Sequence, residues 1–147
     1  MLLTLEKYFV LESNIKANSE FVSDSNKKVD LEVEAAGDLY ENNEDGNKFR
    51  IVISITFDRK KGSRKNSVPY GGSVKMDGFF SLDGNVPNKK RESLLMVNGL
   101  SVLYSAAREH IASVTGRGPW EALYLPIISF RQDETKIDGE ITGVNGD

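Results

Sequence analysis

The 147-residue chain contains no cysteine and only one histidine. Without cysteine there is no disulfide, no thiolate nucleophile, no iron–sulfur cluster and no cysteine-liganded zinc. A metal site or a Ser–His–acid triad needs several convergent partners. His110 lies instead at the edge of an apolar helical stripe, so we expect a structural or interface role for it. We therefore expect no metal, no cofactor and no catalytic residues.

Long apolar runs and strong net charge are also lacking. No stretch reaches the roughly 18 apolar residues of a membrane span, and the first residues lack a basic, then apolar, leader pattern. We expect no membrane insertion and a cytoplasmic location. The net charge of -3 gives no reason to expect nucleic acid as a partner. A hydrophobic fraction of 39% and a charged fraction of 28% are typical of one soluble globular domain.

Four segments alternate apolar and polar residues with a period of two, which is typical of half-buried strands. They span residues 3–15, 29–35, 49–57 and 73–82. The third is the clearest, because its odd-numbered positions are Phe49, Ile51, Ile53, Ile55 and Phe57. Turn-forming residues at 41–47 join the second and third segments, which favours antiparallel pairing between them.

A helical pattern begins near Lys89. Its apolar stripe consists of Leu100, Leu103, Tyr104, Ala107, Ile111 and Val114. The opposite face carries small residues, which permit another helix to approach closely; we predict an oligomer interface at Ser101, Ser105 and Ala112. The pair at 98–99, Asn-Gly, is a candidate kink, and we expect the helix to end at Gly116.

An apolar segment at 123–130 follows the helix, and the sequence then turns polar. The chain therefore predicts an α+β domain over residues 1–130, in which a four-stranded antiparallel sheet packs against one long helix and a crossover follows. Residues 131–147 are expected to form a flexible polar tail. Residues 59–65 form a basic connection, which we interpret as a solvated surface.

Three aromatic residues do not fit a simple core. Phe79 alternates with the apolar residues of the fourth strand, so it lies on the face that carries the polar side chains of that strand. Tyr70 lies in the glycine-rich segment just before the strand, and Trp120 follows a Gly-Pro pair. An aromatic on such a face is either covered by another element or exposed as a binding surface. Apolar grooves with aromatic walls recognise extended peptides, so both interpretations stay open at this point.

Two stretches of the chain resemble the SecB family of export chaperones. Residues 107–111 (A-R-E-H-I), the Arg117-Gly118 pair and residues 123–130 (L-Y-L-P-I-I-S-F) are similar, in that order, to the family's helix-end and crossover block. Residues 77–84 (D-G-F-F-S-L-D-G) are similar to its strand before the long helix. The resemblance covers about residues 3–130.

The resemblance implies a SecB-like fold and an ATP-independent holdase for unfolded or precursor polypeptides. It implies a homo-oligomer, either a dimer or a dimer of dimers with helices packed between dimers. By position it implies a peptide-binding groove at Tyr70, Phe79, Trp120 and Leu123. The resemblance also makes the SecA motor of protein export a candidate partner.

Several positions depart from the family pattern. The strand positions near Gly71 and Ser73 are not acidic, although export members carry acidic residues there for the motor. Ser129 replaces an asparagine, and neither the family's C-terminal helix nor its zinc-binding tail is evident. Two functions therefore stay open: a holdase in protein export, or a dedicated chaperone or adaptor for one partner such as an antitoxin. We expect neither to be enzymatic.

Overall fold

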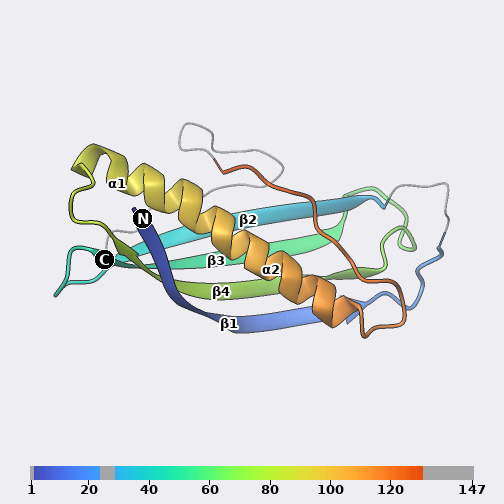
Figure 1. Ribbon diagram of the computed structural model, residues 1–147. Coiled ribbons are helices and arrows are strands. Elements are labelled where there is room, and N and C mark those ends of the chain that lie inside the picture. Colours follow the sequence, from blue (N-terminus) through green and yellow to red (C-terminus); the bar gives the residue numbers. More distant parts are fainter. Residues whose placement is uncertain (1, 24–28, 131–147) are drawn as a thin grey trace.

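The computed structural model describes residues 2–23 and 29–130, and these form a sheet covered on one face by a helix (Figure 1). The antiparallel sheet has the order β1-β4-β3-β2, with strands β1 (Leu3–Ala17), β2 (Leu31–Glu41), β3 (Lys48–Arg59) and β4 (Tyr70–Leu82). One long 28-residue helix follows, made of α1 (Asn88–Leu94), a π-helical turn η1 (Leu95–Gly99) and α2 (Leu100–Thr115). The predicted fold class is confirmed.

Alternation in β3 sets which face of the sheet is buried. Ile51, Ile53 and Ile55 are completely buried beneath the helix, and β2 pairs with β3 in a register that sets Leu39 opposite Ile51. The predicted bounds of the second strand are wrong at both ends. Val29 precedes the strand and is exposed, while pairing continues through Gly37 to Glu41.

Glycines allow the helix to approach the sheet closely. A Cβ atom at Gly37 would lie 2.4 Å from Cδ2 of Leu100, and one at Gly99 would lie 2.5 Å from Cδ1 of Ile51. Real Cβ atoms essentially never show such distances, so a side chain at either position would force Leu100 or Ile51 to shift. The irregularity predicted around 98–99 is a π-helical turn that includes Gly99.

The apolar stripe of the helix is buried as expected, apart from its last member. Buried positions include Leu100, Leu103, Tyr104, Ala107 and Ile111. Val114 is 38% exposed, so its assignment to the stripe is wrong. Thr115, one residue later, takes the inward position and uses its hydroxyl to bond the main chain, as described below.

Residues 116–130 form the predicted crossover, which runs back along α2 without helix or strand (Figure 1). Tyr104 donates a hydrogen bond from its hydroxyl to the carbonyl oxygen of Pro126 at 2.6 Å, and Nε of Arg108 donates to the carbonyl oxygen of Leu125 at 2.8 Å. Apolar residues of the crossover are buried at Leu123, Leu125, Ile128 and Phe130. The predicted tail, 131–147, lies outside the described residues.

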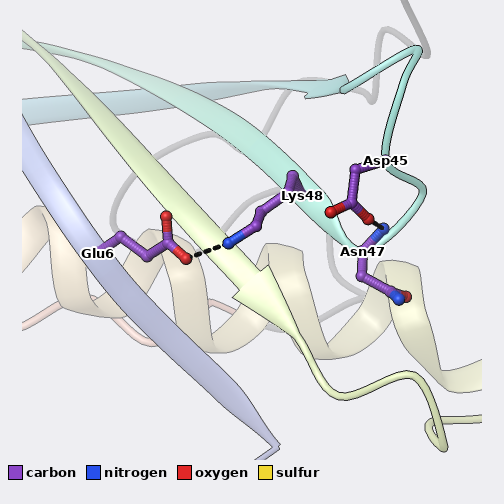
Figure 2. Close-up of polar contacts among 4 residues, drawn as sticks. All are labelled: Glu6, Asp45, Asn47 and Lys48. Atoms are coloured by element: carbon purple, nitrogen blue, oxygen red, sulfur yellow. Dashed lines mark hydrogen bonds and ion pairs between the residues drawn. The ribbon is translucent and has the colours of Figure 1, made fainter.

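A polar contact links β1 and β3 even though β4 lies between them. Nζ of Lys48 donates a hydrogen bond to the carboxylate of Glu6 (Figure 2). Nearby, the main-chain N–H of Asn47 donates to Oδ1 of Asp45 at 2.9 Å and shapes the turn before β3 (Figure 2). The hydrogen bond from Lys48 lowers the pKa of Glu6 below its ordinary value of 4.5.

Candidate functional site

Trp120 is fixed at the start of the crossover through a buried tyrosine. The hydroxyl of Tyr70 donates a hydrogen bond to the carbonyl oxygen of Thr115 at 3.0 Å and accepts one from the main-chain N–H of Trp120 at 3.0 Å. Tyr70 is only 2% exposed. The first residue of β4 therefore ties the end of α2 to the crossover from below.

The side chain of Thr115 makes a second attachment at the same point. Its hydroxyl donates to the carbonyl oxygen of Ile111 at 2.7 Å and accepts the main-chain N–H of Leu123 at 2.8 Å. The main chain is thus held on both sides of Trp120. Such hydrogen bonds satisfy main-chain groups that a loop would otherwise bury without partners.

The segment after β1 reaches the same place through Asn18. Nε1 of Trp120 donates a hydrogen bond to the carbonyl oxygen of Asn18 at 3.1 Å. The side-chain amide of Asn18 donates to the carbonyl oxygens of Lys65 at 2.7 Å and Val68 at 2.9 Å. The ring of Phe21 meets the Trp120 ring edge to face, with centroids 5.2 Å apart at 74°. Three connections therefore converge around one indole.

A cleft of about 1070 Å³ opens between these three connections. Its apolar lining includes Phe21, Val22, Val29, Trp120 and Leu123. Val22 is 61% exposed and Val29 is 43% exposed, so apolar surface in the cleft remains accessible. The charged residues in the described part of its lining are Asp30, Arg64 and Glu121. A concave site with an apolar lining and few charges is suited to an apolar side chain of a ligand.

A smaller hollow of about 470 Å³ lies on the other side of the connection between β3 and β4. Arg59 and Lys65 contribute to this hollow, whereas Ser63 and Arg64 contribute to the large cleft. The connection between β3 and β4 is therefore a wall shared by two depressions.

The four residues of the predicted groove do not come together. Trp120 and Leu123 line the large cleft, and Tyr70 lies beside it as a buried support that also borders the smaller hollow. Phe79 is on the sheet face that the helix does not cover, because the neighbouring residues Gly78 and Phe80 point toward the helix and are buried.

Phe79 belongs to a separate aromatic group on that open face. Its ring lies 6.2 Å from the ring of Phe9 in an edge-to-face arrangement, and Nζ of Lys7 is 5.0 Å from its centroid. On the same face the guanidinium of Arg50 binds both carboxylate oxygens of Asp77, at 2.8 and 2.9 Å. Phe79 thus lies, as predicted, on the face of β4 that carries the polar side chains. Its role in a groove stays a prediction.

Sequence reasoning missed two sets of exposed apolar residues. Phe21 and Val22 lie in a segment that it assigned to no element, and an apolar pair within that polar stretch was their only signal. Tyr124 and Ile127 lie on the outside of the crossover and are 73% and 78% exposed. The apolar run at 123–130 contains both, but composition does not distinguish its inner from its outer residues.

The predicted interface residues differ in their accessibility. Ser105 is exposed, Ser101 is half-buried and donates its hydroxyl to the carbonyl oxygen of Val97 at 2.6 Å, and Ala112 is buried. Val102 and Val114 add exposed apolar surface to α2. The edge strand β1 is a second accessible apolar surface, formed by the exposed residues Tyr8, Phe9, Val10 and Leu11.

Among residues 2–23 and 29–130, no group of three or more acidic, histidine or cysteine side chains is placed to hold a metal ion. His110 accepts or donates a hydrogen bond at Nε2 with the hydroxyl of Ser13, 2.9 Å away, and so links α2 to β1. No helix in this described part has the length and apolar character needed to cross a membrane.

Comparison with known proteins agrees with this architecture. A family model described as preprotein translocase subunit SecB matches residues 7–132. Protein-export proteins SecB from two strains of Acidithiobacillus ferrooxidans are each 25% identical over 129 residues, which is 86% of this chain and 83% of theirs. The family model covers the sheet from within β1 onward, the helix and the crossover.

Two solved structures share the fold. One is a SecB-like chaperone of Mycobacterium tuberculosis in complex with a peptide from an antitoxin, with a TM-score of 0.65, 14% identity, and coverage of 87% of this chain and 91% of that one. The other is a protein of unknown function from Streptococcus agalactiae, with a TM-score of 0.50, 20% identity, and coverage of 84% and 96%. At these identities the likeness concerns the fold.

Proposed function

This chain belongs to the SecB family of chaperones, which are not enzymes, and from that premise we propose that it is an ATP-independent holdase. Its ligands are unfolded or precursor polypeptides in extended conformation. They bind in the cleft beside Trp120, with an apolar side chain of the client against Phe21 and Trp120.

This proposal rests on one observation: the cleft has exposed apolar side chains beside a tryptophan that hydrogen bonds hold in place. Val22 and Val29 remain exposed in the cleft, whereas Trp120 is held by hydrogen bonds to Tyr70 and Asn18. A preformed site loses less conformational entropy when it binds, and an apolar lining accepts many different client sequences. Both properties suit a chaperone that holds clients without using nucleotide.

Within this proposal the predicted groove residues have different roles. Trp120 and Leu123 contact the client, and Tyr70 supports the crossover from beneath. We propose Phe79 as a separate client contact on the open face of the sheet, beside Phe9. The two surfaces make separable contributions, so single substitutions distinguish them.

The test is suppression of aggregation of a chemically unfolded client without ATP, together with the affinity for a fluorescent extended peptide. Trp120→Ala removes an aromatic anchor and is expected to weaken peptide binding by about tenfold or more. Phe79→Ala, measured in parallel, reports the contribution of the open face. Tyr124→Ala is the matched control, because that aromatic is exposed outside the cleft. Wild-type protein that binds no unfolded client would refute the holdase proposal.

A second candidate function is a dedicated chaperone or adaptor for one partner such as an antitoxin. Two observations favour it over general export through the SecA motor. Gly71 and Ser73 on β4 carry no carboxylate, and a solved structure with the same fold holds an antitoxin peptide. Client range separates the two: a dedicated chaperone binds one partner and ignores generic unfolded proteins, whereas an export holdase binds many and associates with the motor.

We also propose that the protein is a cytoplasmic homo-oligomer, either a dimer or a dimer of dimers. The exposed back of α2 supports this, since Ser101 and Ser105 are small and Val102 is an exposed apolar neighbour. The uncovered edge of β1 offers main-chain groups for pairing with another strand. Light scattering of the purified protein tests the oligomeric state directly.

A further inference from the structure

The connection between β3 and β4 concentrates positive charge in a chain whose net charge is negative. Five of the seven residues at 59–65 are lysine or arginine. Four of them, Lys60, Lys61, Arg64 and Lys65, are exposed. Within the described ranges, the ion pairs are Glu6–Lys48 and Arg50–Asp77, so these four cations have no carboxylate partner there.

The same connection has a defined backbone. The main-chain N–H of Ser63 donates to the carbonyl oxygen of Lys60 at 3.0 Å, and Gly62 adopts a φ of 85°, a conformation that favours glycine. Asn18 holds the connection from outside through the carbonyl oxygen of Lys65. The positive charges therefore project from an ordered turn that is attached to the same residue as Trp120.

The connection that carries these charges borders the cleft. Gly62, Ser63 and Arg64 line the cleft that contains Trp120, and Lys65 lines the hollow on the other side. Among the described residues, the carboxylates that line the cleft are Asp30, which precedes β2, and Glu121 in the crossover. Within that part of the chain, the connection between β3 and β4, which we call the basic wall, therefore supplies the positive charge beside the cleft, and the acidic groups come from the other two walls.

We propose that this basic wall selects the client: it favours extended segments that carry carboxylates next to an apolar anchor residue. The inference rests on the proposed holdase function and adds a charge preference to it. An apolar side chain in the cleft brings the flanking residues of the client to the connection, where client carboxylates meet cations that have no carboxylate partner among the described residues. The preference weakens in salt because the cations are exposed, since the screening length falls to about 3 Å at 1 M.

The experiment compares three fluorescent peptides that share one apolar core, flanked by glutamate, by lysine or by serine. With wild-type protein in dilute buffer, we expect the glutamate peptide to bind about tenfold more tightly than the lysine peptide, and the ratio to approach one at 1 M salt. Trp120 is the only tryptophan, so its fluorescence reports independently that each peptide occupies the cleft.

The paired variants are Arg64→Glu/Lys65→Glu and Lys89→Glu/Lys90→Glu. Each reverses two adjacent exposed cations, the first on the basic wall and the second at the start of α1, at the other end of the molecule (Figure 1). We expect the first variant to prefer the lysine peptide and the second to keep the wild-type preference. Circular dichroism and thermal unfolding check that both variants fold.

The outcomes separate this inference from the function on which it rests. If wild-type protein binds the serine peptide but does not distinguish glutamate from lysine, the charge preference is wrong and the holdase proposal stands. If none of the three peptides binds, the holdase proposal itself fails. If single-stranded RNA binds the basic wall as tightly as the glutamate peptide does, and the first variant abolishes that binding, the wall serves nucleic acid and the inference is overturned.

Discussion

The hydroxyl of Tyr70 accepts a hydrogen bond from the main-chain N–H of Trp120 at 3.0 Å. The same hydroxyl donates to the carbonyl oxygen of Thr115, so one buried oxygen atom connects the sheet, the end of the helix and the crossover. The position of the indole in the cleft therefore depends on a residue that is itself almost completely buried. Substitutions of Tyr70 should therefore change the free energy of unfolding as well as the affinity for a client.

Tyr70→Phe removes that oxygen and keeps the ring. We expect a loss of about 1–3 kcal/mol in the free energy of unfolding, because the main-chain N–H of Trp120 loses its partner. The carbonyl oxygen of Thr115 loses one of two partners and keeps the main-chain N–H of Gly118. Urea denaturation at a fixed protein concentration measures it. Tyr124→Phe is the control, since that hydroxyl is on a side chain exposed outside the crossover. Equal midpoints for the two variants would contradict the proposed role of Tyr70.

Gly118→Ala tests the packing of the crossover on Tyr70. A Cβ atom at position 118 would lie 2.3 Å from the hydroxyl oxygen of Tyr70. We expect a loss of stability of about 1–3 kcal/mol from overpacking, and a smaller added cost of Tyr70→Phe in the alanine background, because that change removes the overlapping atom. Gly46→Ala is the control, since its nearest atom would be 3.7 Å away. Additive costs would argue against direct contact.

Ser105→Arg tests the proposed oligomer interface on the back of α2. The serine is exposed, so an arginine is compatible with the folded subunit but not with a second helix packed closely against this face. We expect light scattering to report a smaller species than the wild type. Ser129→Arg places the same side chain on an exposed crossover residue and should leave the mass unchanged. An unchanged mass for both variants would remove this face from the interface.

Glu6→Gln tests the link across β4. The hydrogen bond from Lys48 lowers the pKa of Glu6, so the ionised carboxylate is favoured in the folded state. Its stabilising effect is fully present above the unfolded value near 4.5 and is lost as pH falls through the lower folded value. We expect a small loss of stability for Glu6→Gln at pH 7 that shrinks as pH falls below 4.5 and disappears below the lower folded pKa, measured by thermal unfolding across pH.

Periodicity was sufficient to predict most of the fold. The odd-numbered residues of β3 from 49 to 57 are all apolar and buried, as expected for a strand with one face beneath a helix. Periodicity was less reliable where packing overrides local preference. Gly37 interrupts the apolar pattern of β2, yet the strand continues because the glycine makes room for Leu100. Val29 fits the alternation but precedes the strand and borders the cleft instead.

The candidate site was predicted only in part, for a related reason. The alternation of side chains along β4 correctly placed Phe79 on the polar face of that strand. The same alternation does not indicate which face of the sheet Trp120 lies over. Phe21 had no partner within its own stretch of sequence. Its ring meets the indole of Trp120 only in the tertiary structure.

The sequence by itself determined the secondary structure, the antiparallel pairing and the family, because these depend on local periodicity and on the order of motifs along the chain. The tertiary structure alone decided which residues make the cleft. Trp120 and Asn18 are 102 positions apart and are joined by one hydrogen bond of 3.1 Å. A contact of that kind follows from how the helix and its crossover close over the sheet, and no pattern within either segment encodes it.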